Sequence, residues 1–163
     1  MEEIYIKVGI EFEIPNRFGK YINDIFAPVD ITKYNWKLDW IDMCIRDKND
    51  NTFENLKDFS IPDNEFVKGE ELKSILDIDE YYIIFCVLQA FDNSLPIEIN
   101  TYSEYINSDC ILSLTIDDCT NVILLCKESD MLEKLYDNAF QLNFKNVEYI
   151  FEDDPYSKRV AFD

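Results

Sequence analysis

The longest apolar run of the chain covers residues 81–91, YYIIFCVLQAF. It contains no charged residue, and Gln89 is its one amide. Acidic residues come shortly before the run, and Asp92 follows it. Both alternating faces are apolar, which is typical of a strand buried on both sides. The pattern therefore predicts the central strand of a sheet.

Two earlier stretches alternate between apolar and polar residues, which predicts strands with one buried and one solvent-exposed face. In residues 4–14 the alternation has no break, and we expect one face to enter the core. That face consists of Ile4, Ile6, Val8, Ile10, Phe12 and Ile14. In residues 34–45 an aromatic stripe lies on one side, and such stripes are more often core than ligand cage. The stripe consists of Tyr34, Trp36, Leu38 and Trp40.

Three later stretches also read as strands. Residues 111–116 and 121–126 are apolar and flank the turn residues 117–120, which predicts a hairpin. Residues 147–151 alternate once more and predict a last strand with one buried face.

Apolar residues at helical spacing predict four helices between these strands. Asn16 is the expected N-cap of the first, which would bury Tyr21 and Ile25. The second follows Gly69, with Leu72, Ile75 and Leu76 facing the core. Thr101 and Glu104 form a capping box that opens the third. Ser129 is the expected cap of the fourth and longest, whose inner face should hold Leu132, Leu135, Tyr136, Ala139 and Phe140.

Along the chain, helices alternate with strands that mostly have one buried and one exposed face, and this arrangement predicts an α+β fold. We expect a mixed or antiparallel sheet with helices mainly on one face, arranged as an open sandwich. No linker or internal repeat interrupts the chain, so residues 1–163 are predicted to form a single domain. Residues 46–64 show no sustained period and are expected to form a long loop or a short irregular hairpin.

Charge narrows the choice of partner. The chain carries 34 acidic and 15 basic residues, a net charge of −19. The middle third, residues 61–120, contains Lys68 and Lys73 as its basic residues. Direct binding to nucleic acid or to an anionic membrane is disfavoured, because phosphate groups require clustered Lys and Arg. The acidic N-terminal residues do not resemble a secretory signal, so the expected location is the cytoplasm.

Several chemistries are excluded by residues that the sequence lacks. The chain has no histidine, which removes Ser-His and Cys-His nucleophiles and the usual zinc sites. Its five cysteines form no CxxC pair and are expected to be reduced structural thiols. The start of a calcium loop at Asp47 departs from the pattern, with Thr52 where glycine is needed and Asp58 where glutamate is needed. We predict no catalytic residue, no cofactor and no metal.

The candidate functional surface lies immediately before the central strand. Seven acidic residues fall within the eighteen positions 63–80, and the predicted helix would carry several on its outer face. These residues are Asp63, Glu65, Glu70, Glu71, Asp77, Asp79 and Glu80. Such a surface steers a basic protein into fast, salt-sensitive association. The chain is therefore expected to be a non-enzymatic protein-binding module, of inhibitor or immunity type, for a basic partner.

An alternative reading is a hydrolase or a small-molecule-binding domain that uses buried carboxylates. Paired carboxylates perform acid–base chemistry when one of them is desolvated. The close pairs in the sequence are Glu11/Glu13, Asp39/Asp42, Asp79/Glu80 and Asp117/Asp118. In a chain with 34 acidic residues, such pairs are expected by chance.

Five segments carry a resemblance to a known family. They are GIEFEIPN (9–16), DIFAPVD (24–30), GEELKSIL (69–76), TYSEYINSDC (101–110) and FKNVEYI (144–150). With these segments the chain resembles domain-of-unknown-function family 2691, small acidic proteins of low-GC Gram-positive bacteria. The likeness spans nearly the whole chain and is weakest in residues 46–64. It implies a cytoplasmic protein of a single domain, and it assigns no catalytic residue.

Overall fold

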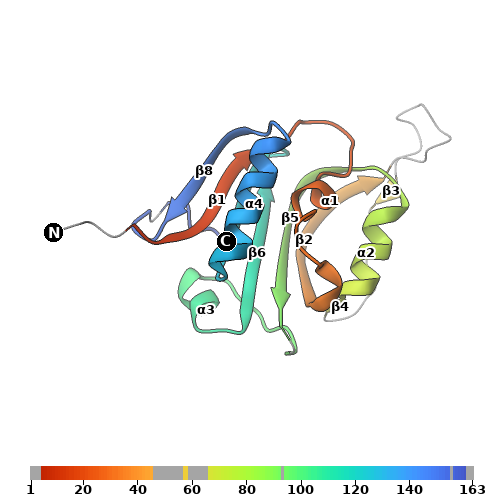
Figure 1. The fold of residues 1–163 in the computed structure, drawn as a ribbon. Helices are drawn as coiled ribbons and strands as arrows, with labels where there is room; N and C mark the ends of the chain where they lie inside the picture. Colours follow the sequence, from red (N-terminus) through yellow and green to blue (C-terminus); the bar gives the residue numbers. More distant parts are fainter. Residues whose placement is uncertain (1–4, 46–56, 59–65, 93, 155, 161–163) are drawn as a thin grey trace.

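The strands of the chain form one open sheet (Figure 1). The computed structural model describes residues 5–45, 57–58, 66–92, 94–154 and 156–160. The strand order is β3-β2-β5-β6-β7-β1-β8, with β4 also paired to β2, and each neighbouring pair is antiparallel. The strands are β1 (Lys7–Glu13), β2 (Asn35–Ile45), β3 (Lys57–Asp58), β4 (Val67–Lys68), β5 (Tyr81–Phe91), β6 (Cys110–Asp117), β7 (Asn121–Cys126) and β8 (Lys145–Phe151). The predicted α+β class with an open sheet is confirmed, and of the two predicted kinds of sheet the antiparallel one is observed.

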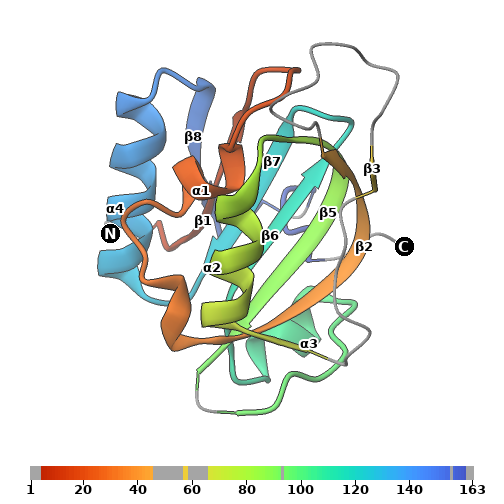
Figure 2. The same ribbon diagram turned by 90° about the vertical axis from the view of Figure 1, so that its right-hand side faces the viewer.

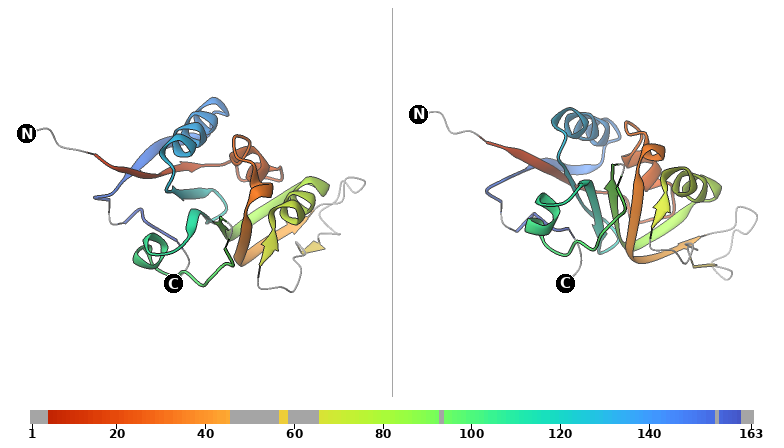
Figure 3. Two further views of the ribbon diagram at one scale, coloured as in Figure 1. Left: turned by 60° about the horizontal axis from the view of Figure 1, so that its bottom comes forward. Right: turned by 90° about the horizontal axis from the view of Figure 1, so that it is seen from below.

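The helices connect these strands. They are α1 (Tyr21–Ile25), the short 3-10 helix η1 (Ile31–Lys33), α2 (Gly69–Ile78), α3 (Tyr102–Ile106) and α4 (Ser129–Gln141). Helices α1, α2 and α4 lie on one side of the sheet, with α1 and α2 in front of the strands in Figure 2 and α3 on the other side in Figure 3. Their buried residues join a single apolar cluster with the strand residues that face them. We call this side the helical face.

The opposite side, which we call the second face, has a smaller apolar cluster. Helix α3 and residues 156–160 lie on it (Figure 3). Tyr105 from α3 and Val160 from the C-terminal segment pack there with Phe91 and Leu125 of the sheet. This cover leaves part of the second face open beside strands β7, β1 and β8.

The central strand was predicted with its correct bounds, because β5 spans Tyr81–Phe91. It pairs with β2 on one side and with β6 on the other. Every residue from Cys86 to Phe91 is buried, so this half of the strand is covered on both faces. The predicted hairpin is also confirmed, since β6 and β7 pair from Leu112 with Cys126 to Asp117 with Asn121.

The alternation of the first strand is interrupted, contrary to the sequence prediction. Ile10, Phe12 and Ile14 are buried as expected, but Ile6 is 52% exposed and Val8 packs in the cluster of the second face. A register shift between Lys7 and Gly9 explains the change, because an extra residue in a strand reverses the faces beyond it.

A second register shift breaks the aromatic stripe of β2. It lies between Asp39 and Asp42, and Trp40 within it has a φ of 53°. Trp36 is fully buried, whereas Trp40 is 56% exposed. The prediction that Trp40 belongs to a buried stripe was therefore wrong, and a bulge is the physical reason.

Helix α1 begins later than predicted, and Asn16 does not cap it. The N-cap position is Lys20, which makes no side-chain cap. The hydroxyl of Tyr81 instead accepts hydrogen bonds from the backbone N–H groups of Ile22 (2.9 Å) and Asn23 (3.1 Å). The first turn of a helix leaves such groups without partners inside the helix. A residue of the central strand thus performs the role that the sequence assigned to Asn16.

Helix α2 follows Gly69 as predicted, with Leu72 and Leu76 buried. Its first residue lies against η1, because a Cβ atom at Gly69 would be 2.1 Å from the carbonyl oxygen of Ile31. The Gly69 N–H donates to the carbonyl oxygen of Tyr34 at 2.9 Å. Glycine is therefore required here by close backbone approach.

The last two helices confirm the predicted caps in part. Thr101 accepts a hydrogen bond from the Glu104 N–H at 3.1 Å, as the capping box requires. Ser129 is already inside α4, and the cap position, Glu128, makes no side-chain cap. Phe140, expected on the inner face, is 64% exposed.

Most of residues 46–64 lie outside the described part of the chain, including the calcium-like start at Asp47. Lys57 and Asp58 form β3 against Ile45 and Cys44, so Asp58 belongs to a strand pair. Within the described residues, no helix has the length and apolar character needed to cross a membrane.

Candidate functional site

The predicted acidic surface is divided by the fold. Asp63 and Glu65 lie outside the described residues, so their part of the prediction is untested. Glu70 and Glu71 are exposed in the first turn of α2, where negative charge favours the helix. Asp79 and Glu80 lie between α2 and β5 and are half-buried. The structure thus places five of the seven residues on or next to α2.

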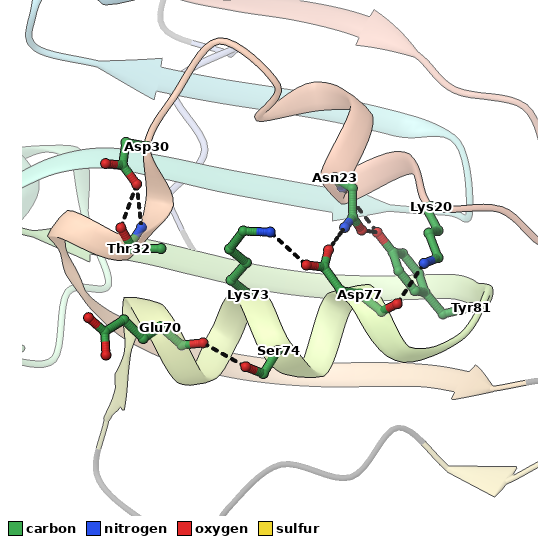
Figure 4. Close-up of polar contacts among 9 residues, drawn as sticks. All are labelled: Lys20, Asn23, Asp30, Thr32, Glu70, Lys73, Ser74, Asp77 and Tyr81. Carbon is green, nitrogen blue, oxygen red and sulfur yellow. Dashed lines mark hydrogen bonds and ion pairs between the residues drawn. The ribbon is translucent and has the colours of Figure 1, made fainter.

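The negative charge of Asp77 is compensated by neighbouring residues (Figure 4). Its carboxylate lies 2.6 Å from the Lys73 ammonium and accepts a hydrogen bond from the Asn23 side-chain amide at 2.8 Å. The Lys20 ammonium donates to the Asp77 carbonyl oxygen at 2.7 Å. Asp77, whose side chain is exposed, therefore joins α2 to α1.

The pKa of Asp77 reflects the same contacts. The hydrogen bond from Lys73 holds this pKa below its ordinary value, and the amide of Asn23 adds to the effect. A lowered pKa in the folded state means that the interaction is fully present above the ordinary carboxyl range and is lost as the pH falls through the folded-state value. The contribution of Asp77 to stability is therefore present at neutral pH and is lost in acidic solution.

A second group of acidic residues surrounds a hollow on the open part of the second face. The hollow has a volume of about 480 Å³ and is bounded by strands β1, β6, β7 and β8. Its carboxylates are Glu11, Glu13, Asp117 and Glu148. The same hollow is lined by one cation, Arg159, and by the amides of Asn121 and Asn146. Negative side chains from three strands and one cation thus share a concave surface.

The position of Glu11 is electrostatically unfavourable for the free chain. In the register of β1 and β8 it lies directly opposite Glu148. Opposite residues of an antiparallel pair have neighbouring side chains, and like charges there destabilise the sheet. On its other side, in β7, Glu11 faces Ile123, which offers no compensating charge.

The other two carboxylates of the hollow have partners. Arg159 forms an ion pair with Asp117. The amide of Asn146 donates to Glu13 at 2.7 Å, and Lys145 lies opposite Glu13 in the register of β1 and β8. Among the described residues, Glu11 and Glu148 therefore form the uncompensated part of the hollow.

The alternative hypothesis of a buried catalytic carboxylate finds little support in the geometry. Across the described residues, the buried polar side chains are Gln89, Ser113 and Thr115, and no Asp or Glu is among them. Desolvation raises the pKa of Asp24, a half-buried residue of α1. Asp24 does not line the hollow at Glu11, and it does not line a second hollow that lies beside Asp77 and Lys73. An acid held in a dry pocket is the arrangement that this hypothesis requires.

Two further expectations concern metals and thiols. No cluster of three or more potential metal ligands occurs within the part of the chain that the structure describes. All five cysteines are free, and Cys86, Cys110 and Cys126 are buried. Both observations leave the carboxylates as the chemically distinctive groups of the described surface.

Sequence reasoning found Glu11, Glu13 and Asp117 as members of close pairs but did not bring them together. It missed Glu148 and Arg159 entirely. Their proximity depends on β1 lying between β7 and β8, an order that periodicity along one strand does not contain. The available signal was that several strands carry an acidic residue on the face opposite their core residues.

Comparison with known proteins places the chain in a family. Residues 7–161 match the family described as protein of unknown function (DUF2691). The chain is also 33% identical over 147 residues to the uncharacterized protein YncE of Bacillus subtilis strain 168, a match covering 90% of this chain and 93% of that protein. No solved structure matches the chain. The resemblance seen in the five sequence segments is therefore confirmed, and the chain belongs to the DUF2691 family.

Proposed function

We propose that the chain is a non-enzymatic protein-binding module of inhibitor or immunity type, and that the acidic hollow on its second face receives a basic partner. The observation that carries the proposal is the placement of Glu11 directly opposite Glu148 within that hollow. Two adjacent carboxylates without a cation oppose folding, so their presence is better explained by an external positive charge.

The shape of the hollow supports this role. A volume of about 480 Å³ accommodates a few side chains of a partner rather than a whole helix. Concave surfaces lined by one sign of charge concentrate the field and attract the opposite charge. A lysine or arginine entering the hollow would contact Glu11 and Glu148 together and relieve their repulsion.

The α2 surface has a different part in the proposal. The Asp77 carboxylate already pairs with Lys73 and Asn23, so we do not place the main contact with the partner at this residue. Among the described residues, the side-chain carboxylates of Glu70 and Glu71 have no hydrogen-bond or ion-pair partner, and the Glu70 backbone carbonyl accepts from the Ser74 hydroxyl. They contribute long-range attraction during the approach of a basic partner, which raises the association rate more than the affinity.

A cytoplasmic location belongs to the same proposal. The five free cysteines agree with a reducing compartment, where disulfides are rare. The basic partner would accordingly be a protein of the same compartment.

The proposal is tested with a defined cation, a fluorescent decalysine peptide, titrated into the full chain at low salt and at about 0.15 M salt. Two variants separate the sites while changing the net charge equally. Glu11→Gln with Glu148→Gln neutralises the hollow, and Glu70→Gln with Glu71→Gln neutralises the start of α2. We expect a salt-sensitive affinity that falls about tenfold in the first variant and about twofold or less in the second, because close pairs outweigh distant charges.

Equal losses in the two variants would mean that only the net charge matters, and the hollow would not be a site. A larger loss in the α2 variant would move the contact to the surface around Glu70. Absence of salt-sensitive binding to the wild-type chain would contradict the proposed function as a whole.

A further inference from the structure

We infer that the second face holds a binding groove for an extended peptide segment of the pattern basic, basic, apolar, and that the chain's own residues Lys158, Arg159 and Val160 occupy this groove in the free protein. The inference rests on the proposed function and deepens it, because it specifies which segment of a basic partner is recognised. It also makes the C-terminal segment an internal competitor of that partner.

The groove is built from three buried polar side chains on two neighbouring strands. Gln89 of β5 lies directly opposite Ser113 of β6, and Thr115 follows two residues along β6. Each of the three is at most 1% exposed. Buried polar groups in a sheet cost free energy unless they form hydrogen bonds. These three therefore require a partner that lies on the second face.

That partner is the main chain of the C-terminal segment. The Gln89 amide donates to the Val160 carbonyl oxygen at 2.9 Å, and the Ser113 hydroxyl donates to the same oxygen at 3.4 Å. The Thr115 hydroxyl donates to the Arg159 carbonyl oxygen at 3.4 Å. Contacts to main-chain carbonyls are independent of side-chain identity, so any extended segment can make them.

Gln89 also retains an unused hydrogen-bonding group. Among the described residues its buried side-chain oxygen has no hydrogen-bond partner, although its nitrogen donates to Val160. An amide side chain offers both a donor and an acceptor, and an extended peptide presents both a carbonyl and an N–H group. The Gln89 side-chain oxygen can therefore accept one main-chain hydrogen bond that residues 156–160 do not donate.

Side-chain recognition adds specificity to these main-chain contacts. Val160 is 2% exposed within the apolar cluster of the second face. Arg159 forms an ion pair with Asp117 at the rim of the acidic hollow. The Lys158 ammonium lies 4.6 Å from the centre of the Tyr102 ring in α3. The groove thus has an apolar position, a carboxylate position and an aromatic position in sequence.

The groove and the hollow form one continuous surface, because Asp117 and Arg159 belong to both. A basic segment that enters the hollow can extend along the groove only if Lys158–Val160 moves aside. The tethered segment competes at a high effective concentration, which lowers the apparent affinity for an external segment. A partner therefore binds more tightly to a chain whose C-terminal segment is released.

The test uses a fluorescent peptide with the sequence of residues 156–160, YSKRV, and full-length variants. Arg159→Ala removes the ion pair at a surface position and should leave the fold intact. Arg159→Glu with Val160→Asp expels the segment more strongly, by repulsion from Asp117 and by introducing a buried charge. We expect YSKRV to bind at least about tenfold more tightly to the double variant than to wild type, and about threefold more tightly to Arg159→Ala. The peptide YSKEV should bind none of the three.

Equal affinity of YSKRV for wild type and for the folded variants would overturn the inference. If the double variant is unfolded by circular dichroism, the Arg159→Ala comparison decides alone. Adding Asp117→Asn to Arg159→Ala must abolish the gain in affinity for YSKRV that Arg159→Ala gives over wild type. An unchanged gain in affinity would also overturn the inference. The proposed function is judged separately by decalysine, so decalysine binding without YSKRV binding would reject the groove and retain the hollow.

Discussion

At the scale of single residues, Tyr81 has the most connected role. Its ring is buried where the central strand begins, and its hydroxyl binds two backbone N–H groups of α1. The same hydroxyl donates to the Asn23 side chain at 2.6 Å. One phenol thus completes the start of a helix 58 and 59 residues away in the sequence. Local sequence signals could not reveal this cap, because its hydroxyl comes from a distant strand.

Replacing Tyr81→Phe should lower the free energy of unfolding by about 1–3 kcal/mol, since the buried Ile22 N–H and the partly buried Asn23 N–H lose their acceptor. Urea unfolding followed by circular dichroism measures the change. The matched control is Tyr82→Phe, because Tyr82 is half-buried and its hydroxyl bonds the side chains of Asn16 and Cys119 rather than the backbone of a helix. A control loss as large as that of Tyr81→Phe would show that the cap is unimportant.

The cysteines supply a second prediction at this scale. Burial raises the pKa of Cys86 and of Cys110 to about 12, and that of Cys126 to about 11. The reactive thiolate is therefore scarce at these sites near pH 8, whereas Cys44 and Cys119 are partly exposed. A thiol reagent should modify two cysteines of the folded chain rapidly and all five in denaturant. Rapid modification of three or more in the folded chain would contradict the described burial.

At the scale of elements, the contact between α2 and η1 depends on Gly69. A Cβ atom there would lie 2.1 Å from the Ile31 carbonyl oxygen and 2.6 Å from the Thr32 Cα. Gly69→Ala should therefore destabilise the chain by about 1–3 kcal/mol, even though alanine is the better helix former. The control Ser74→Ala, at an exposed position of the same helix, should change stability by less than about 0.5 kcal/mol. Urea unfolding of the two variants provides the comparison, and a neutral Gly69→Ala would mean that η1 moves freely.

The pairing of β1 with β8 gives a prediction in which stability and function oppose each other. Glu148→Lys places a cation opposite Glu11, so thermal and urea unfolding should show a gain of about 0.2–1 kcal/mol. The same change should weaken decalysine binding, because the hollow loses a carboxylate and gains a cation. Asp153→Lys, at an exposed turn position after β8, is the charge-matched control. If the Glu148→Lys variant is less stable than the Asp153→Lys variant, this result would argue against repulsion between Glu11 and Glu148.

At the scale of the whole molecule, the sequence predicted the class of fold because the periodicity of each element is local. The central strand, the hairpin and the core of α2 follow from the residues that compose them. The bulges at Gly9 and Trp40 were not predictable in this way, because each is a mismatch between two paired strands. The same reason applies to the site. Charge density along the sequence pointed to residues 63–80, whereas strand order gathered Glu11 and Glu148 from opposite ends of the chain.

In the proposed function, a basic partner meets the hollow of the second face. The most direct measurement is an NMR titration of the wild-type chain with decalysine at low salt, followed through the backbone amides. We expect the largest shifts at residues 11, 13, 121, 146 and 148, which line the hollow, and we expect them to reverse on addition of salt. Shifts concentrated at residues 69–72 of α2, or spread evenly over the surface, would contradict binding at the hollow.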